Sequence, residues 1–190
     1  MKGDDLLNKE GSIDIGSYKA KEKYNFEEIY DEYFTRVYKF LSYRINNEED
    51  VKDLTAEVFK KIFSKLSSYD KEKSNLDVWI FAIARNTLYD YYRKINRRQI
   101  LPLEKIKNMF SSDKDLHEEV ERAEEITYLK KAIEKLNERE KQIISYKFGA
   151  ELNNKDIAEL MNLSQSNVSV IVYRTIKKLR KEMEEYYEFK

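Results

Sequence analysis

The sequence predicts an all-α protein made of two small helical domains joined by a linker. Glycine and proline are scarce, with 4 Gly and 1 Pro in 190 residues, so the residues that most often interrupt helices are rare. Apolar residues recur at three- and four-residue steps, and this recurrence lapses around the lone proline, Pro102. We expect a tail over 1–23, a first domain over 24–96, a linker over 97–115 and a second domain over 116–190.

The first domain is predicted to contain three long helices. Apolar stripes with the spacing of one helix face run over 26–41, 51–66 and 76–95. A polar loop from Ser67 to Lys73 separates the second stripe from the third. Three helices of this length can bury their stripes against one another, so we expect this part of the chain to form one domain.

The second domain is predicted to end in a helix-turn-helix. A stripe over 120–136 is followed by a helix that stops at Gly149, and two further helices share the span 154–179. Asn162 lies between them, and asparagine tolerates the left-handed conformation of a tight turn. Residues that can cap the predicted helices stand before several of them: Asn46 or Asn47, Ser74 with Asp77, Asn137 with Glu140, Asn154, and Ser164.

The last helix has an outer face suited to DNA. Arg174 can pair with a guanine edge, Asn167 with an adenine edge, and Val170 can meet a thymine methyl group. The alternative to a DNA-binding helix-turn-helix is a helical hairpin that serves only as a packing unit. The complete predicted outer set is Ser166, Asn167, Ser169, Val170, Tyr173, Arg174 and Lys177.

Charge is balanced overall but unevenly distributed. The chain has 36 basic and 36 acidic residues, so its net field does not favour DNA. Basic residues cluster over 93–107 and 174–181, and acids dominate 113–125. Two basic patches predict a protein that touches a polyanion at two places, with solvated helix faces as the alternative interpretation.

Several functional classes are disfavoured. The chain has no Cys and 1 His. Disulfides and thiolate catalysis are therefore excluded, and His117 alone predicts no metal site. No apolar run reaches the roughly 20 residues of a membrane span. We expect a soluble, cytoplasmic protein that is not an enzyme and needs no cofactor or metal.

Motifs in the second domain resemble region four of the sigma family of bacterial RNA polymerase. They are Leu136–Glu140, Ile157–Leu160, Val168, Tyr173–Arg174 and Lys178–Leu179. The resemblance implies that the helix-turn-helix reads the minus-thirty-five promoter element. The same motifs are also similar to the helix-turn-helix of response regulators.

Motifs in the first domain decide between these two families. Asp53–Phe59 resembles the region-two signature of sigma factors, and Trp79–Asn86 resembles the segment that follows it. With no further domains between or before them, the chain resembles the small extracytoplasmic function (ECF) group. Its richness in Lys, Asn, Ile and Tyr indicates an AT-rich genome, and the toxin-gene sigma factors of clostridia share this composition.

The resemblance implies which residues of the first domain are functional. Asp53 and Glu57 lie four residues apart, on one helix face. Together with Leu54 and Phe59, they are expected to bind RNA polymerase. The end of the third helix and the loop before it are expected to bind and open the minus-ten element through aromatic planes, amides and cations. This second set is Asn75, Trp79, Asn86, Tyr89, Tyr92, Arg93 and Arg97.

The sequence therefore predicts a sigma factor with polymerase core and promoter DNA as partners, and family resemblance adds an anti-sigma factor. Ala56, Asn137, Ser169 and Val170 depart from common family residues, so promoter preference does not transfer. A helix-turn-helix regulator without a sigma role and a helical interaction module that binds no DNA are the alternatives.

Overall fold

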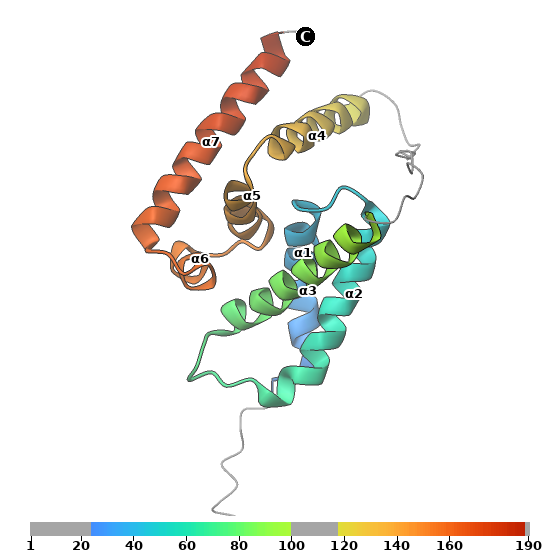
Figure 1. Cartoon of the computed structure of the whole chain (residues 1–190), viewed down its shortest axis with the longest axis vertical. Helices are drawn as coiled ribbons and strands as arrows, with labels where there is room; N and C mark the ends of the chain where they lie inside the picture. Colours follow the sequence, from blue (N-terminus) through green and yellow to red (C-terminus); the bar gives the residue numbers. More distant parts are fainter. Residues whose placement is uncertain (1–23, 100–117, 189–190) are drawn as a thin grey trace, which may run out of the picture.

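The computed structural model describes residues 24–99 and 118–188, and in these ranges the regular elements are helical. The first range contains α1 (Phe26–Ser42), α2 (Glu48–Lys65), the 3₁₀ turn η2 (Leu66–Ser68) and α3 (Leu76–Gln99). The second contains α4 (Glu118–Glu134), α5 (Glu138–Ile144), the π turn η3 (Ser145–Gly149), α6 (Asn154–Met161) and α7 (Gln165–Glu188) (Figure 1). The predicted all-α class with two helical domains is confirmed.

The first domain is a three-helix unit in which α1 packs on α2 and α2 packs on α3. The predicted stripes supply its core, with Val37 from α1, Val58 from α2 and Leu88 from α3 each 0% exposed. The helix α3 continues through Gln99, three residues beyond the predicted end of the first domain at residue 96. The predicted tail over 1–23 and residues 100–115 of the predicted linker lie outside the described residues.

The helix caps show how local signals place these elements. Asn47 caps α2 by accepting a hydrogen bond from the Asp50 amide, as the sequence indicates. Neither of the other two caps of the first domain was predicted. Asn25 caps α1. Asn75, not Ser74, accepts from the Val78 amide at 2.8 Å, because α3 begins one residue later than the capping-box pattern suggested.

In the second domain, the predicted capping box is present. The Asn137 side chain accepts from the Glu140 amide, and the Glu140 carboxylate accepts from the Asn137 amide. Asn153, rather than the predicted Asn154, caps α6. Between α6 and α7, Asn162 adopts the left-handed conformation with φ 53° and ψ 53°, and the Ser164 hydroxyl accepts from the Asn167 amide. Both features of this turn match the sequence-based expectation.

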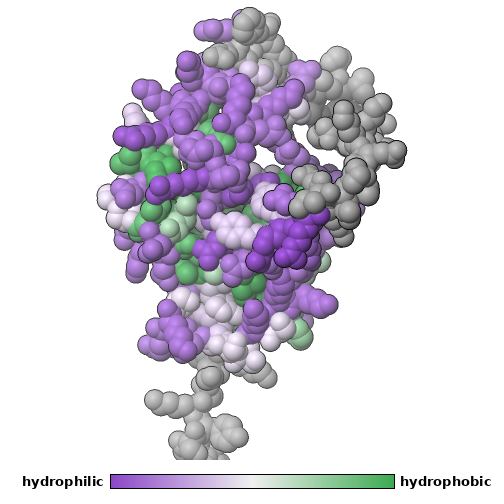
Figure 2. Space-filling view, in the orientation of Figure 1, coloured by the Kyte–Doolittle hydropathy of each residue, from purple (hydrophilic) through white to green (hydrophobic). Residues whose placement is uncertain are grey.

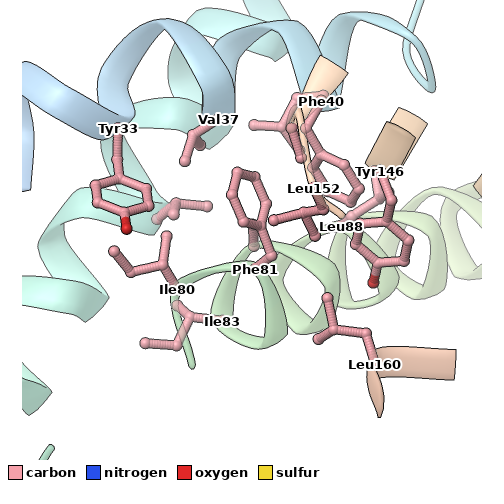
Figure 3. Packing of buried hydrophobic residues seen from close by; sticks show 14 of the residues in the cluster. Tyr33, Val37, Phe40, Ile80, Phe81, Ile83, Leu88, Tyr146, Leu152 and Leu160 are labelled. Atoms are coloured by element: carbon pink, nitrogen blue, oxygen red, sulfur yellow. The ribbon is translucent and has the colours of Figure 1, made fainter. Parts of the chain in front are cut away.

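The two domains share one hydrophobic core. Tyr146 of η3 stacks on Phe40 of α1 with ring centroids 5.0 Å apart, and Leu152 and Leu160 belong to the same buried cluster as Phe81 of α3 (Figure 3). In the ribbon, α5 and α6 lie against the three-helix unit while α7 extends away from it (Figure 1). The visible surface is mostly hydrophilic with small apolar patches (Figure 2), in keeping with a chain that is 38% charged.

Candidate nucleic-acid and polymerase interfaces

The helix α7 presents the predicted DNA-reading face to solvent. Val168 and Thr175 are 0% exposed and hold the helix to its domain, whereas Val170 is 45% and Tyr173 69% exposed. This difference follows from the helical period, since the buried and exposed sets lie on opposite sides of one cylinder. All seven predicted residues are exposed, namely Ser166, Asn167, Ser169, Val170, Tyr173, Arg174 and Lys177.

The C-terminal half of α3 forms an open hollow of about 450 Å³. The Tyr92 hydroxyl beneath it donates a hydrogen bond of 2.6 Å to the Arg44 carbonyl oxygen, and burial raises the pKa of this phenol. Tyr92 therefore stays protonated and anchored, with its ring as part of the wall. The lining residues are Asn86, Tyr89, Tyr92, Arg93 and Asn96. The sequence indicated four of them, and it missed Asn96, which lies one turn beyond Tyr92.

Positive charge at this end of α3 is partly paired. Arg93 forms an ion pair with Asp90, and the hydrogen bond from Arg93 lowers the pKa of that carboxyl group. Asp90 also lies 3.7 Å from the Lys61 ammonium of α2. Arg97 is exposed, so the cationic end of α3 is directed toward solvent beyond the hollow.

The N-terminal end of α3 holds the remaining two predicted minus-ten residues. Trp79 is half-buried, and its ring lies 5.1 Å from that of Tyr69, so it packs beneath the loop before α3. Asn75 is exposed, but its amide nitrogen donates to Asp156 of α6 at 2.7 Å. The two ends of α3 are therefore different: one opens into the hollow, and the other contacts the second domain.

The predicted polymerase-binding residues of α2 divide into two groups. Asp53 is exposed, and Glu57 is partly exposed and forms an ion pair of 2.8 Å with Lys61. Leu54 and Phe59 are each only 5% exposed, so they pack in the core of the three-helix unit and hold α2 in place. Only the two acids can meet a partner directly.

An exposed aromatic surface on α1 and α2 was missed by the sequence analysis. Phe63 is 66% exposed and packs edge-on against Phe26 at 5.1 Å. Tyr30 and Phe34 continue this surface along α1 and are 40% and 38% exposed. A signal was present, because Phe63 lies outside the stripe formed by Val51, Leu54, Val58 and Ile62. On the helical wheel, it lies about 80° from Asp53 and about 120° from Glu57, within the exposed part of α2.

The described ranges contain no group of three or more His, Cys, Asp or Glu that could hold a metal ion. No helix within 24–99 or 118–188 is long and apolar enough to cross a membrane. His117, which the sequence analysis set aside, lies outside the described residues.

Comparison with known families matches both domains. The model of sigma-70 region 2 matches residues 29–98, and that of sigma-70 region 4 matches residues 132–181. The chain belongs to the sigma-70 family. Region 2 thus contains α1 to α3, and region 4 begins at the end of α4 and includes the helix-turn-helix. Members of this family are non-enzymatic transcription initiation factors.

Relatives of similar length place the chain in the ECF group. It is 25% identical to the RNA polymerase sigma factor YlaC of Bacillus subtilis, over 86% of this chain and 94% of YlaC. It is 28% identical to the ECF RNA polymerase sigma factor SigM of the same organism, over 81% of this chain and 92% of SigM. The predicted ECF membership is confirmed, while the narrower similarity to clostridial toxin-gene sigma factors stays a prediction.

Solved structures share the fold. The sigma factor RpoE of Bartonella quintana, in complex with the anti-sigma factor NepR, superposes with a TM-score of 0.63 at 19% identity, covering 84% of this chain and 96% of RpoE. CnrH in complex with the cytosolic domain of CnrY gives a TM-score of 0.58 at 18% identity, over 84% and 88% of the two chains.

Proposed function

We propose that this sigma factor binds RNA polymerase core through α2 and directs it to promoters through α3 and α7. The observation that carries this proposal is the presence, on one chain, of an exposed acidic and aromatic face on α2 and an exposed polar and basic face on α7. A regulator that acts through α7 alone has no need of the exposed acidic and aromatic face on α2.

For the polymerase contact, we assign Asp53 and Glu57 as the acids that meet a basic partner surface, with Phe63 as an apolar anchor beside them. Exposed aromatic side chains are enriched where protein partners meet. Leu54 and Phe59 contribute to this contact indirectly, because each is buried in the core and fixes the position of α2. Ala56 is exposed on the same helix and supplies space rather than a hydrogen bond.

For the minus-thirty-five element, α7 enters the major groove of duplex DNA. Arg174 and Asn167 read base edges, and Val170 meets a thymine methyl group. Ser166 and Tyr173 contact phosphates, as do Ser169 and Lys177, which positions the helix without reading sequence.

For the minus-ten element, the hollow on α3 receives an unstacked base of the melted strand. The ring of Tyr89 offers a stacking plane, and Asn86 offers an amide for a base edge. Arg93 and Arg97 hold the phosphates. Trp79 and Asn75 support the loop before α3, where a second base is accepted. No bond is made or broken by the protein, so it acts as a binding and positioning factor and not as an enzyme.

Two further assignments rest on relatives. RpoE was solved with an anti-sigma factor, and we extend such a partner to this chain. We place the protein in the cytoplasm, where polymerase and promoter DNA are found.

The test is run-off transcription from a promoter library with polymerase core, comparing the wild type with the double variant Asp53→Lys and Phe63→Ala. Glu184→Lys, which inverts an exposed acid on α7, is the matched control. We expect transcripts that depend on the protein, a loss of at least tenfold in the double variant and little change in the control. Binding to DNA without any transcript would support the regulator instead.

A further inference from the structure

Lys61 of α2 lies between the surface assigned to polymerase and the surface assigned to the minus-ten element. The two helices that carry these surfaces, α2 and α3, lie side by side (Figure 1). The Lys61 ammonium group is 2.8 Å from the Glu57 carboxylate of α2 and 3.7 Å from the Asp90 carboxylate of α3. Glu57 belongs to the acidic face of α2, and Asp90 pairs with Arg93 at the hollow. Lys61 therefore contacts one acid at each surface.

A buried hydroxyl group holds Lys61 in this position. The Thr87 side chain is buried in α3 and donates a hydrogen bond of 2.9 Å to the Ile83 carbonyl oxygen. The Thr87 oxygen accepts a hydrogen bond of 3.1 Å from Lys61. The distance from Lys61 to Asp90 is longer than a hydrogen bond by about 0.5 to 1 Å. A small movement of the ammonium group can therefore exchange Glu57 for Asp90 as its closer partner.

Asp90 is in turn shared between two cations. The hydrogen bond from Arg93 lowers the pKa of the Asp90 carboxyl group, and the charges of Lys61 and Lys94 act in the same direction. The Arg93 side chain is 71% exposed, so a DNA phosphate can reach its guanidinium group. A phosphate that draws Arg93 away leaves Asp90 with Lys61 as its remaining ion-pair partner in the part of the chain that the structure describes.

These four side chains alternate in sign along a path from α2 to the hollow on α3: Glu57, Lys61, Asp90 and Arg93. Their formal charges sum to zero, so the two acids compete for Lys61. A basic polymerase surface that meets Glu57 releases Lys61 toward Asp90, and Asp90 then holds Arg93 less firmly. A phosphate on Arg93 has the reverse consequence and leaves Glu57 available to polymerase. Thermodynamic linkage requires the two effects to be equal in size.

We propose that Lys61 is a positioning residue that couples the polymerase contact at Glu57 to the phosphate contact at Arg93, by moving its ion pair from Glu57 to Asp90. This inference rests on the proposed function and adds a link between two of its sites. Partly exposed ion pairs change an equilibrium by only about two- to fivefold. The coupling therefore adjusts the affinity for each partner and does not switch either contact on or off.

The experiment measures how much a single-stranded minus-ten oligonucleotide tightens the binding of the whole chain to polymerase core. The chain has no cysteine, so Glu188→Cys at the exposed end of α7 can carry a fluorophore. Fluorescence anisotropy gives the Kd for core with and without a saturating oligonucleotide from a promoter selected in the transcription library. An oligonucleotide of scrambled sequence gives the baseline, and the ratio of the two Kd values above this baseline is the tightening factor.

The factor is compared among the wild type, Lys61→Met, Glu57→Gln and the double variant. Methionine keeps the length and the apolar part of the lysine side chain but removes the charge. We expect Lys61→Met to lower the factor by about two- to fivefold. Glu57→Gln should lower it by the same amount, and the double variant by no more than either, because each change breaks the same link.

A merely structural role for Lys61 makes a different prediction. Loss of packing between α2 and α3 would weaken core binding equally with and without the oligonucleotide, and the factor would not change. Lys61→Arg retains a cation and should restore most of the factor. Circular dichroism checks that each variant is folded, and if Lys61→Met does not fold, Glu57→Gln and Lys61→Arg test the link without it.

Lys52→Met is the matched control. Lys52 pairs with Glu48 and Glu49 at 3.0 Å and 3.1 Å, and both acids belong to α2, so its loss should leave the factor unchanged. The same factor in Lys61→Met and the wild type would overturn the coupling, as would an equal loss in Lys52→Met or additive losses in the double variant. Failure of the wild type to bind core at all would instead overturn the proposed function, and the coupling with it.

Discussion

The two DNA-reading surfaces of this chain differ in what their side chains touch. On α7, the outer residues follow from the period of a single helix, and Tyr173 is 69% exposed. On α3, Tyr92 is tied to the Arg44 carbonyl oxygen, Arg93 to Asp90, and Asn75 to Asp156. The first surface is made by one element, whereas the second is shared among several.

This difference has an energetic consequence. A ligand that binds α7 meets side chains that are already exposed, whereas a ligand that binds α3 displaces internal hydrogen bonds before it gains new ones. Only the surplus over such costs appears as affinity. Minus-ten binding is therefore more sensitive to changes elsewhere in the chain than minus-thirty-five binding is.

The largest effect is expected at the contact between the regions, with Tyr146→Ala. Removing a fully buried ring that stacks on Phe40 should lower the free energy of unfolding by about 3 to 5 kcal/mol. Urea denaturation followed by circular dichroism measures this change.

Tyr146→Phe is the matched control for that variant. The Tyr146 hydroxyl is buried and meets no hydrogen-bond partner among the described residues, so its removal should change stability by less than about 1 kcal/mol. Similar losses in both variants would show that the hydroxyl, and not the ring packing, holds the regions together.

The next effect concerns reading by α7. Arg174→Ala should weaken binding of the minus-thirty-five duplex by about 1 to 3 kcal/mol if the guanidinium pairs with a guanine, and should relax specificity at one base pair. Lys177→Ala should weaken all duplexes alike and lower the salt dependence by about one counterion. Anisotropy with single-base variants at two salt concentrations separates the two roles. If Arg174→Ala weakened the binding of all duplexes equally, Arg174 would contact a phosphate and would not read a base.

The surface of α7 was predictable because its determinants are local. The helical period, the Ser164 cap and the left-handed Asn162 all act within a few residues, and each of these expectations agrees with the structure. The region-2 and region-4 assignments were also predictable, since each motif is a short continuous run of sequence.

The division of α2 into buried and exposed residues was not predictable in the same way. Phe59 lies outside the main stripe and is buried because Tyr30 and Phe34 of α1 cover it, with ring centroids at 4.8 Å and 6.0 Å. The docking of region 4 likewise depends on pairs such as Arg36 with Ala150, which are 114 positions apart. No local pattern encodes contacts of this range.

A smaller effect should appear with pH at the junction of α5 and α7. Burial acts to raise the pKa of the Glu140 carboxyl group, but hydrogen bonds from Lys178 and the Asn137 amide outweigh it and lower the pKa. A carboxyl group with a lowered pKa in the folded state stabilises the protein above its unfolded pKa, and this contribution is lost as pH falls through the folded value.

Glu140→Gln should therefore cost about 1 to 2 kcal/mol at neutral pH, and less in acid. Thermal unfolding between neutral pH and the acidic range measures the difference. Glu159→Gln, at an exposed acid on α6, is the control and should leave the profile unchanged. An equal cost at all pH values would show that side-chain packing, and not charge, explains the role of Glu140.

The smallest expected effect lies at the turn between η3 and α6, where Glu151 has a φ of 57°. A left-handed conformation costs a residue with a Cβ about 1 to 2 kcal/mol, whereas the exposed ion pair of Glu151 with Lys39 contributes less than about 1 kcal/mol. Glu151→Gly should thus be more stable than Glu151→Ala, although glycine usually destabilises. Lys39→Ala isolates the ion pair, and urea midpoints rank the three variants. Equal urea midpoints for Glu151→Ala and Glu151→Gly would show that residue 151 is not left-handed in solution. The Ala150 carbonyl oxygen would then not be held in place by this turn for its hydrogen bond with Arg36.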